Sequence, residues 1–213
     1  MKLRIVACAL ALAVVYAASA QAADFKETAR KVAESASKSV VTVRVVCSLK
    51  LTIQGQNMDQ EQKNEVPGTV IDPSGLTVVS ATMLDPSAAL KRMLAGVKLD
   101  ASIKDTTLIL ADGTEVPAEV VMKDTDLDMA FVRPKDTTKT FDAVTLKPRS
   151  AQPRILDDVF VVGRMGKEGN RTHTVELGTI RAQVKGPRSF YLCSGEVSEN
   201  PGCIVYTADG EPL

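Results

Sequence analysis

Residues 66–86 read VPGTVIDPSGLTVVSATMLDP, two short runs of β-branched residues on either side of a turn. Asp72-Pro73-Ser74-Gly75 indicates the turn, because proline presets a turn dihedral angle and glycine accepts a positive φ. Valine, isoleucine and threonine dominate the flanking runs, which favours strands over helices. The stretch therefore predicts a strand, a tight turn and a second strand.

Short strands of the same kind are predicted from Ser39 to the end of the chain, separated by glycine, proline and aspartate turns. Many short strands at regular spacing are typical of all-β barrels and sandwiches. Two stretches interrupt the pattern. Residues 54–65 are polar and aperiodic, which predicts an exposed loop. Residues 85–104 predict a helical insertion, and one side of 90–98 either packs on the barrel or binds a partner.

The first 22 residues have the composition of a secretory signal peptide. Lys2 and Arg4 precede an apolar run from Ile5 to Ala18, and small residues follow. The alternative is a membrane anchor, but the apolar run is short for a bilayer span. Residues 23–38 then predict a short amphipathic helix. We therefore expect an exported protein, either periplasmic or secreted.

The overall charge is balanced, with 26 basic and 26 acidic residues. A neutral chain gives no reason to expect nucleic acid or an anionic membrane surface as a partner. Removal of the signal peptide leaves Cys47, Cys193 and Cys203. Export permits a disulfide, for which Cys193 and Cys203 are the closest pair in sequence, while the alternative is three buried thiols. A zinc site formed by the three cysteines and His173 lacks the short ligand spacings of such sites, so no metal or cofactor is expected.

Several pieces of the chain together resemble a known fold. They are VPGTVIDPSGLTVVSATMLDP, LILADGTEVPAEVVMKDTDLDMAFVRP, DDVFVVGRMGKEGNRTHTVELGTIRAQV, NPG and ADGEPL, in that order. Their order resembles the trypsin-like (chymotrypsin-like) double β-barrel and, within it, the HtrA/Deg family of exported proteases. The resemblance implies two six-stranded barrels, at 39–145 and 159–213, joined by a linker at 146–158. The second barrel is expected to be incomplete at the C-terminus.

The resemblance also implies where a catalytic triad would lie. Asp128 in DTDLDMAFV occupies the position of the acid. The position of the histidine falls on Met83, or on Thr82 if the alignment shifts by one residue. The position of the serine falls on Asn200, or on Cys203 in another register. Neither Met83 nor Thr82 is a base near neutral pH, so a proton acceptor is missing from the expected triad.

Other residues could serve as a nucleophile or a base, but none of them replaces the whole triad. Cys203 as a nucleophile would still require a base to form the thiolate. Ser194 is followed by a glycine, but it comes too early in the chain and has the same requirement. The only histidine, His173, falls in the second-barrel region, and a surface or strand-end role is the simpler interpretation.

These substitutions favour an exported pseudoprotease, a trypsin-like peptidase homologue that is catalytically inactive. Its expected partner is an extended or unfolded polypeptide, or a protein for which it serves as a scaffold, since proteins of this fold hold peptides by strand addition. The alternative is an active HtrA/Deg-like serine endopeptidase with a misaligned or non-standard triad. Oligomerisation stays open, because an incomplete barrel leaves an edge strand that can pair with another chain.

Overall fold

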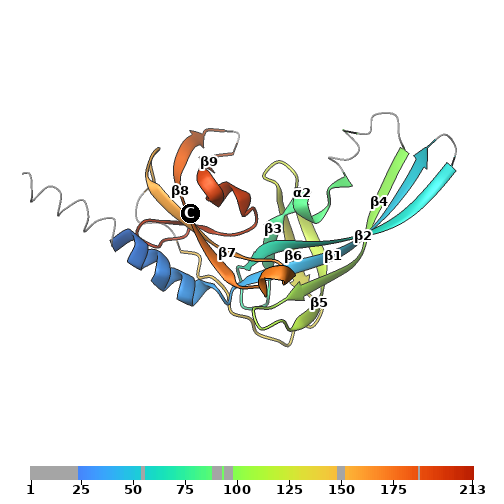
Figure 1. The fold of residues 1–213 in the computed structure, drawn as a ribbon, viewed down its shortest axis with the longest axis horizontal. Coiled ribbons are helices and arrows are strands. Elements are labelled where there is room, and N and C mark those ends of the chain that lie inside the picture. Colours follow the sequence, from blue (N-terminus) through green and yellow to red (C-terminus); the bar gives the residue numbers. More distant parts are fainter. Residues whose placement is uncertain (1–23, 54–55, 88–92, 94–97, 148–151, 187) are drawn as a thin grey trace, which may run out of the picture.

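The computed structural model describes residues 24–213 apart from 54–55, 88–92, 94–97, 148–151 and 187. The predicted signal peptide and most of the helix predicted within 85–104 lie outside the described residues. Figure 1 shows an N-terminal helix, a second β-sheet and a β-barrel arranged along the molecule. The predicted all-β, trypsin-like class with a short N-terminal helix is therefore confirmed. In the described part of the chain, no helix combines the length and the apolar character needed to cross a membrane.

The first barrel is closed and has six antiparallel strands in the order β1-β2-β3-β6-β5-β4. The strands are β1 (Val40–Ile53), β2 (Gln56–Val70), β3 (Thr77–Ser80), β4 (Lys98–Ile109), β5 (Glu115–Asp124) and β6 (Met129–Pro134). The turn predicted at Asp72–Gly75 does join β2 to β3, and the Gly75 N–H donates to the Asp72 carbonyl at 2.8 Å. The opening stretch of sequence thus forms the hairpin that it predicts.

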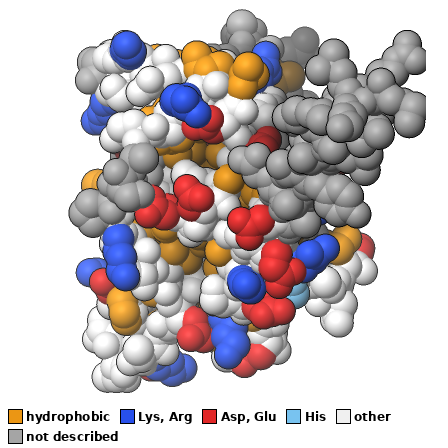
Figure 2. All heavy atoms as spheres, turned by 90° about the vertical axis from the view of Figure 1, so that its left-hand side faces the viewer, with side chains coloured by type: hydrophobic (Ala, Val, Ile, Leu, Met, Phe, Trp, Pro, Cys, Tyr) orange, Lys and Arg blue, Asp and Glu red, His pale blue; other side chains and the backbone are white. Residues whose placement is uncertain are grey.

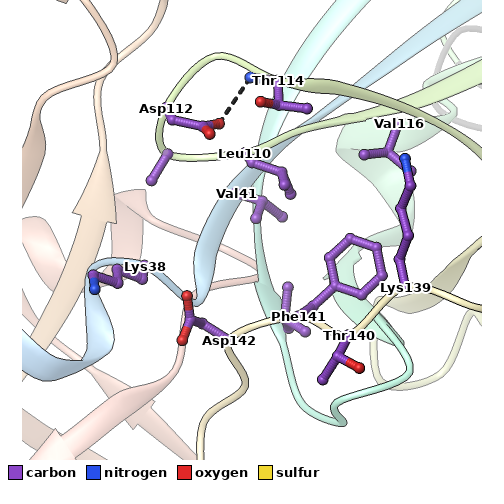
Figure 3. A pocket seen from close by; sticks show the side chains of 12 residues that line it. Lys38, Val41, Leu110, Asp112, Thr114, Val116, Lys139, Thr140, Phe141 and Asp142 are labelled. Carbon is purple, nitrogen blue, oxygen red and sulfur yellow. Dashed lines mark hydrogen bonds between the residues drawn. The ribbon is translucent and has the colours of Figure 1, made fainter.

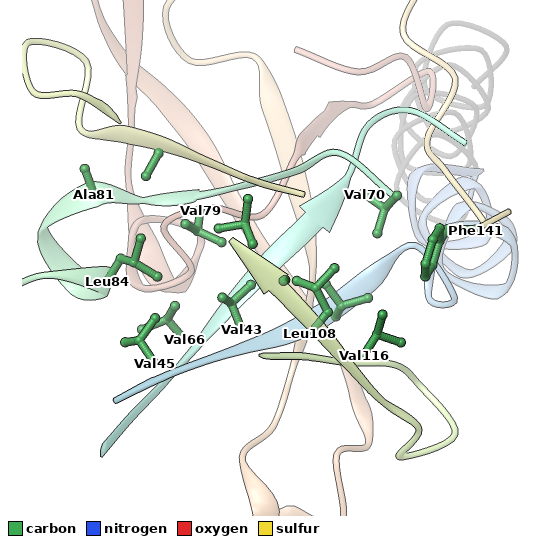
Figure 4. Packing of buried hydrophobic residues seen from close by; sticks show 14 of the residues in the cluster. Val43, Val45, Val66, Val70, Val79, Ala81, Leu84, Leu108, Val116 and Phe141 are labelled. Atoms are coloured by element: carbon green, nitrogen blue, oxygen red, sulfur yellow. The ribbon is translucent and has the colours of Figure 1, made fainter. Parts of the chain in front are cut away.

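The interior of this barrel is filled by small branched side chains (Figure 4). Val41, Val43 and Val45 alternate along β1, and none of the three has measurable exposure. They meet Leu108 of β4 and Val132 of β6, which are equally buried. Because successive side chains on a strand point to opposite faces, this period of two buries one face of each strand.

Strands β1, β2 and β4 continue past the barrel as a long three-stranded arm (Figure 1). The pairing of β1 with β2 runs from Val40 opposite Thr69 to Ile53 opposite Gln56. The loop predicted at 54–65 is therefore wrong from Gln56 onward, where the chain is strand β2. Polar side chains suit this strand because its residues Met58–Gln62 are exposed, and the pairing with β1 supplies the backbone hydrogen bonds.

The helical insertion predicted at 85–104 also needs correction. A short helix, α2 (Ala81–Leu84), comes before it, and strand β4 begins at Lys98. Residues 98–104 therefore belong to a strand that pairs with β1, from Lys98 opposite Thr52 to Ile103 opposite Cys47. Alternating Leu99, Ala101 and Ile103 fit a strand as well as a helix, which explains the error.

The second half of the chain forms a four-stranded sheet in the order β10-β7-β8-β9. Its strands are β7 (Asp158–Arg164), β8 (His173–Val184), β9 (Phe190–Cys193) and β10 (Val205–Thr207), and the 3-10 helices η1 (Lys167–Gly169) and η2 (Gly195–Glu199) follow β7 and β9. Of the two six-stranded barrels expected, the described residues close only the first. The second is an open sheet.

Both faces of this second sheet are covered near its centre. Phe160 of β7 faces the helix at residues 24–36 and stacks on Tyr206 of β10, with ring centroids 5.4 Å apart. Val159 and Val161 point to the other face, where they pack with Ile180 and with Val197 of η2. A strand buried on both faces reads as a continuous apolar run, as VFVV does here.

Arg164, at the end of β7, joins the second sheet to the start of the barrel. Its Nε donates to the carbonyl of Val40 at 2.7 Å, and its two terminal nitrogens donate to the carbonyls of Ser37 and Arg171. Arg171 continues the junction, because it donates to the Thr42 hydroxyl and pairs with Glu65, both at 3.0 Å. One half-buried guanidinium thus satisfies three main-chain carbonyls from different segments.

Replacement of Arg164 by alanine leaves those three carbonyls without donors. We expect the free energy of unfolding to fall by about 2–4 kcal/mol, because each unsatisfied buried acceptor is costly. Chemical denaturation measures the loss. The matched control is Arg133→Ala, which removes an exposed ion pair with Glu119 and should cost no more than about 0.5 kcal/mol. Equal stability of the two variants would show that Arg164 does not hold the junction.

Candidate functional site

Asp128, the expected triad acid, lies in the turn between β5 and β6 with a left-handed backbone (φ 53°). Both oxygens of its carboxylate have donors from the segment where β3 ends and α2 begins. Oδ2 accepts from the Ser80 hydroxyl at 2.6 Å, and Oδ1 accepts from the Thr82 backbone N–H at 2.7 Å. The Asp128 carbonyl accepts from the Ala81 N–H at 3.1 Å. The acid therefore fastens the β5–β6 turn to the start of helix α2.

Burial raises the pKa of the Asp128 carboxyl, but the hydrogen bonds from Ser80 and Thr82 oppose it and prevail. The pKa of Asp128 therefore lies below its ordinary value, and the side chain is a carboxylate at neutral pH. A charge stabilised in this way needs no imidazolium partner.

Met83 lies in helix α2, whose first residues are bonded to this acid. The Ser80 hydroxyl caps the helix by accepting from the Met83 N–H at 3.2 Å, so Ser80 bonds at once to the helix and to Asp128. The side chain of Met83 is 40 % exposed, and Thr82 is exposed as well. The structure thus brings the expected acid and the expected histidine position together, but the latter carries a thioether. Ser80 was not predicted as a site residue, although a serine directly before a short helix is a common N-cap signal.

The NPGC segment, Asn200–Cys203, is a type II turn. Pro201 and Gly202 occupy its centre, Gly202 has φ +91°, and the Cys203 N–H donates to the Asn200 carbonyl at 3.1 Å. Gly202 also packs against the barrel, where an added Cβ would lie 2.9 Å from the Val79 Cα. The Gly202 carbonyl accepts from the Thr69 hydroxyl at 3.2 Å. The turn therefore brings the expected nucleophile loop against β3, next to Ser80.

Asn200, the expected serine position, points away from Asp128 and into the second sheet. Its Nδ2 donates to the carboxylate of Glu176 on β8 and to the Glu196 carbonyl. Its Oδ1 occupies the space that a Cβ on Gly163 would need. Asn200 therefore has a packing role between β7, β8 and η2.

Cys203, the nucleophile of the other register, follows the turn and packs against buried residues on both faces of the second sheet. Burial raises the pKa of its thiol to about 12, and the nearby Glu176 carboxylate adds to the rise. Since the thiolate is the nucleophile, only about one molecule in 10⁵ would carry it at neutral pH. This environment suits a structural thiol.

Ser194 and His173 are also engaged elsewhere. The Ser194 hydroxyl lies 2.8 Å from the Thr179 hydroxyl and ties the end of β9 to β8. His173 is exposed at the start of β8, opposite Arg164. No hydrogen bond from His173 to Asp128 occurs among the described residues, so the structure does not assemble a triad around this acid.

The cysteines are free thiols in the structure, so the predicted bond between Cys193 and Cys203 is not formed. Cys193 lies on β9 and Cys203 next to β10, at opposite edges of the four-stranded sheet, which keeps the two apart. Cys47 is buried in the barrel. Within the described ranges, no three His, Cys, Asp or Glu side chains gather closely enough to hold a metal ion.

A cleft of about 540 Å³ lies between the barrel and the second sheet. The barrel contributes Val78, Val79 and Leu127–Met129, and the second half contributes Ser189–Tyr191, Cys193, Pro201–Val205 and Leu213. Asp128 is the one charged side chain in this lining, which is otherwise mostly apolar. The volume is that of a ligand site, and an apolar wall with few polar groups suits the side chains of a polypeptide.

A second hollow, of about 490 Å³, opens at one end of the barrel (Figure 3). Phe141, Leu110 and Val116 form its apolar part, and exposed charges such as Lys38 and Asp142 stand at its rim. These charges do not converge on a common point. The hollow therefore offers less chemistry than the cleft.

Charges of both signs are interspersed over the face shown in Figure 2, and the single histidine is visible among them. No large area of one sign stands out on this face. This agrees with the balanced composition and offers no extended basic surface there for nucleic acid.

The pKa of Cys203 generates a first prediction for the site. At about pH 7.5, iodoacetamide should alkylate Cys203 in the native chain about a thousandfold more slowly than in the urea-unfolded chain, because the pKa falls from about 12 to its ordinary 9.0 on unfolding. Peptide mass spectrometry after timed quenching measures both rates. Rapid alkylation of the native chain would restore Cys203 as a candidate nucleophile.

The hydrogen bonds of Asp128 lead to a second prediction, on stability. Asp128→Asn keeps the size and tolerates the left-handed backbone but removes the charge. At neutral pH we expect a loss of about 1 kcal/mol in the free energy of unfolding, a modest value because the group is partly exposed. A depressed pKa stabilises the fold above the ordinary value of 3.8, and this is lost as the pH falls through the folded-state pKa. The gap between wild type and variant should therefore close below about pH 4; a gap that persists there would contradict the assignment.

Comparison with known proteins agrees with this geometry. The family model described as "Trypsin-like peptidase domain" matches residues 66–212, from the last third of β2 nearly to the end of the chain. A search of curated proteins finds no match. The matched range includes the turn that carries Asp128, the NPGC turn and every residue of the cleft lining except Leu213. The chain therefore belongs to the trypsin-like peptidase domain family.

Proposed function

We propose that this trypsin-like peptidase homologue does not cleave peptide bonds and instead binds extended or unfolded polypeptide in the cleft between its barrel and its second sheet. Export to the periplasm or the cell exterior, and the narrower likeness to the HtrA/Deg proteases, are part of the same proposal. Their support is the sequence of the first 22 residues and the order of the motifs.

The main support is the way in which Asp128 is bonded. In a working triad the acid orients a histidine, which takes the proton of the nucleophile. Here the two carboxylate oxygens accept from the Ser80 hydroxyl and the Thr82 N–H, and the residue at the expected histidine position is Met83. Asp128 is thus held by the segment Ser80–Thr82, and no histidine stands among the described residues that line the cleft to take the proton of an attacking hydroxyl or thiol.

The nucleophile loop gives independent support. An oxyanion hole needs backbone N–H groups directed at one point, and Pro201 has none to give. Gly202 is packed on the barrel, and its carbonyl is bonded to Thr69. The cleft itself keeps its volume and its apolar lining. These features are compatible with binding of a polypeptide, whereas they do not supply the oxyanion-hole donors that hydrolysis requires.

The test uses fluorescein-labelled casein, an unfolded polypeptide, for both activities. We expect no release of small fluorescent fragments and no labelling of the chain by a fluorophosphonate probe, while fluorescence anisotropy reports binding. Turnover that Asp128→Ala abolishes would overturn the proposal and establish the active endopeptidase instead.

A matched pair of variants locates the binding. Val205→Arg places a long charged side chain in the cleft and should weaken casein binding about tenfold or more, because it takes up the apolar space and its charge favours water over a buried position. Val121→Arg, on an exposed side chain of β5, should leave binding unchanged. Thermal unfolding of both variants checks that they fold. Equal affinities would place the site outside the cleft.

A further inference from the structure

The cleft carries one charged group on otherwise uncharged walls. Among the described residues that line it, Asp128 is the only one with a charge at neutral pH. The barrel wall around it includes Val78, Leu127 and Met129, and the opposite wall includes Val205. Apolar walls lower the local dielectric constant and focus the field of a fixed charge, so Asp128 acts strongly on whatever enters the cleft.

Neutral donors stabilise the charge of Asp128. Its two carboxylate oxygens accept from the Ser80 hydroxyl at 2.6 Å and from the Thr82 N–H at 2.7 Å. Burial raises the pKa of Asp128, but these hydrogen bonds outweigh it and keep the group ionised without cancelling its charge. In the described part of the chain, no lysine, arginine or histidine forms an ion pair with this carboxylate. Asp128 therefore presents a net negative charge to the cleft.

Two basic side chains close to this turn in the fold are paired with other acids. Arg188, which directly precedes the lining segment that begins at residue 189, pairs with Asp124. Lys123, near the end of β5, pairs with Asp85 at 2.7 Å. Either cation would have to give up its own partner in order to neutralise Asp128.

The Asp128 carboxylate can accept further hydrogen bonds. An ionised carboxylate offers about four lone-pair positions, and the bonds from Ser80 and Thr82 use only part of this capacity. A cation in the cleft can therefore bond to Asp128 without displacing the donors that hold the β5–β6 turn to helix α2.

We propose that the cleft selects polypeptide segments in which one lysine or arginine is flanked by apolar residues. The basic group bonds to Asp128, and the flanking side chains lie on the apolar walls. The inference rests on the proposed binding function and names the class of segment that is bound. An acidic residue at the same place would be repelled, so the single charge also excludes competing segments.

The experiment measures how well unlabelled peptides displace fluorescein-labelled casein from the whole chain. The peptides are acetylated and amidated, they alternate valine with serine, and their central residue is lysine, Nε-acetyl-lysine or glutamate. Acetylation preserves the length of the lysine side chain and removes its charge. We expect the lysine peptide to bind about fivefold more tightly than the acetyl-lysine peptide, because its bond to Asp128 is charge-assisted but partly exposed. The glutamate peptide should bind more weakly than either.

Two variants of the β5–β6 turn form a matched pair. Asp128→Asn and Asp126→Asn each remove one negative charge, but Asp126 is exposed and lies outside the described lining of the cleft. Asp128→Asn should abolish the preference for lysine over acetyl-lysine, whereas Asp126→Asn should preserve it. The preference is a ratio of two peptides on the same variant, so a general loss of stability does not mimic the result. Thermal unfolding checks that both variants fold.

A zero-length carbodiimide cross-link gives a second measurement on the unaltered chain. The reagent joins a lysine amine to a carboxylate in contact with it, and peptide mass spectrometry identifies the acid. We expect the lysine of the bound peptide to be joined to Asp128. A lysine peptide that binds without joining to Asp128 would overturn the inference, and this measurement decides the matter if Asp128→Asn fails to fold.

The outcomes separate the two proposals. Casein that binds, together with peptides that compete equally whatever their central residue, would overturn selection by Asp128 and leave the proposed function standing. A preference for lysine that Asp128→Asn retains, or that both variants lose, would place its cause outside Asp128 and would also overturn the inference. Failure of casein to bind would overturn the proposed function itself.

Discussion

The contact between Gly202 and the end of β3 is the constraint on which the arrangement of the two halves depends. An added Cβ at this position would meet the Pro67 carbonyl and the Val79 Cα, both at 2.9 Å, so only glycine allows the approach. The positive φ of Gly202 then turns the chain so that Cys203 and β10 run beside the barrel. With Arg164 at the other side of the junction, this contact fixes the walls of the cleft.

The same contact changes what the loop can do chemically. A nucleophile loop must leave its main-chain N–H groups free to meet a developing negative charge. Here the Cys203 N–H closes the turn onto Asn200, and the Asn200 side chain is bonded to Glu176 and Glu196. These groups thus hold the loop within the second half of the chain, while the Gly202 carbonyl bonds it to Thr69 of the barrel. The segment Asn200–Cys203 keeps its place in the fold, but its hydrogen bonds serve packing and not the stabilisation of a reacting group.

Much of the fold was predictable from sequence because its signals are local. The Asp72–Gly75 turn and the run VFVV predict strands that the structure contains. Two errors have different causes: residues from Gln56 are a polar, exposed strand, and residues 98–104 have an apolar spacing that also fits a helix. Residues from Gln56 onward are polar yet lie in β2. Backbone hydrogen bonds to β1 stabilise this strand without an apolar side-chain face. The strand order of the open second sheet could not be predicted, because it depends on pairing between segments far apart in sequence. Hydrophobic periodicity is a local signal and carries no information on such pairing.

The site was predictable in position but not in role. Motif order predicted Asp128 and Met83 as triad positions, but no pattern indicated that the Ser80 hydroxyl and the Thr82 N–H would bond to the Asp128 carboxylate. Asn200 and Cys203 likewise have partners, Glu176 above all, that come from a distant strand. Such bonds depend on how two sheets meet, which no single stretch of the sequence encodes.

The left-handed backbone of Asp128 has a further consequence for how its presence should be judged. Few residue types occupy that conformation easily, and fewer still can also receive a hydroxyl and an amide from an adjoining segment. The backbone conformation and these hydrogen bonds therefore restrict substitution of Asp128, whether or not the protein hydrolyses peptides. In homologues with the same turn between β5 and β6, an aspartate at this position is therefore weak evidence of catalytic activity.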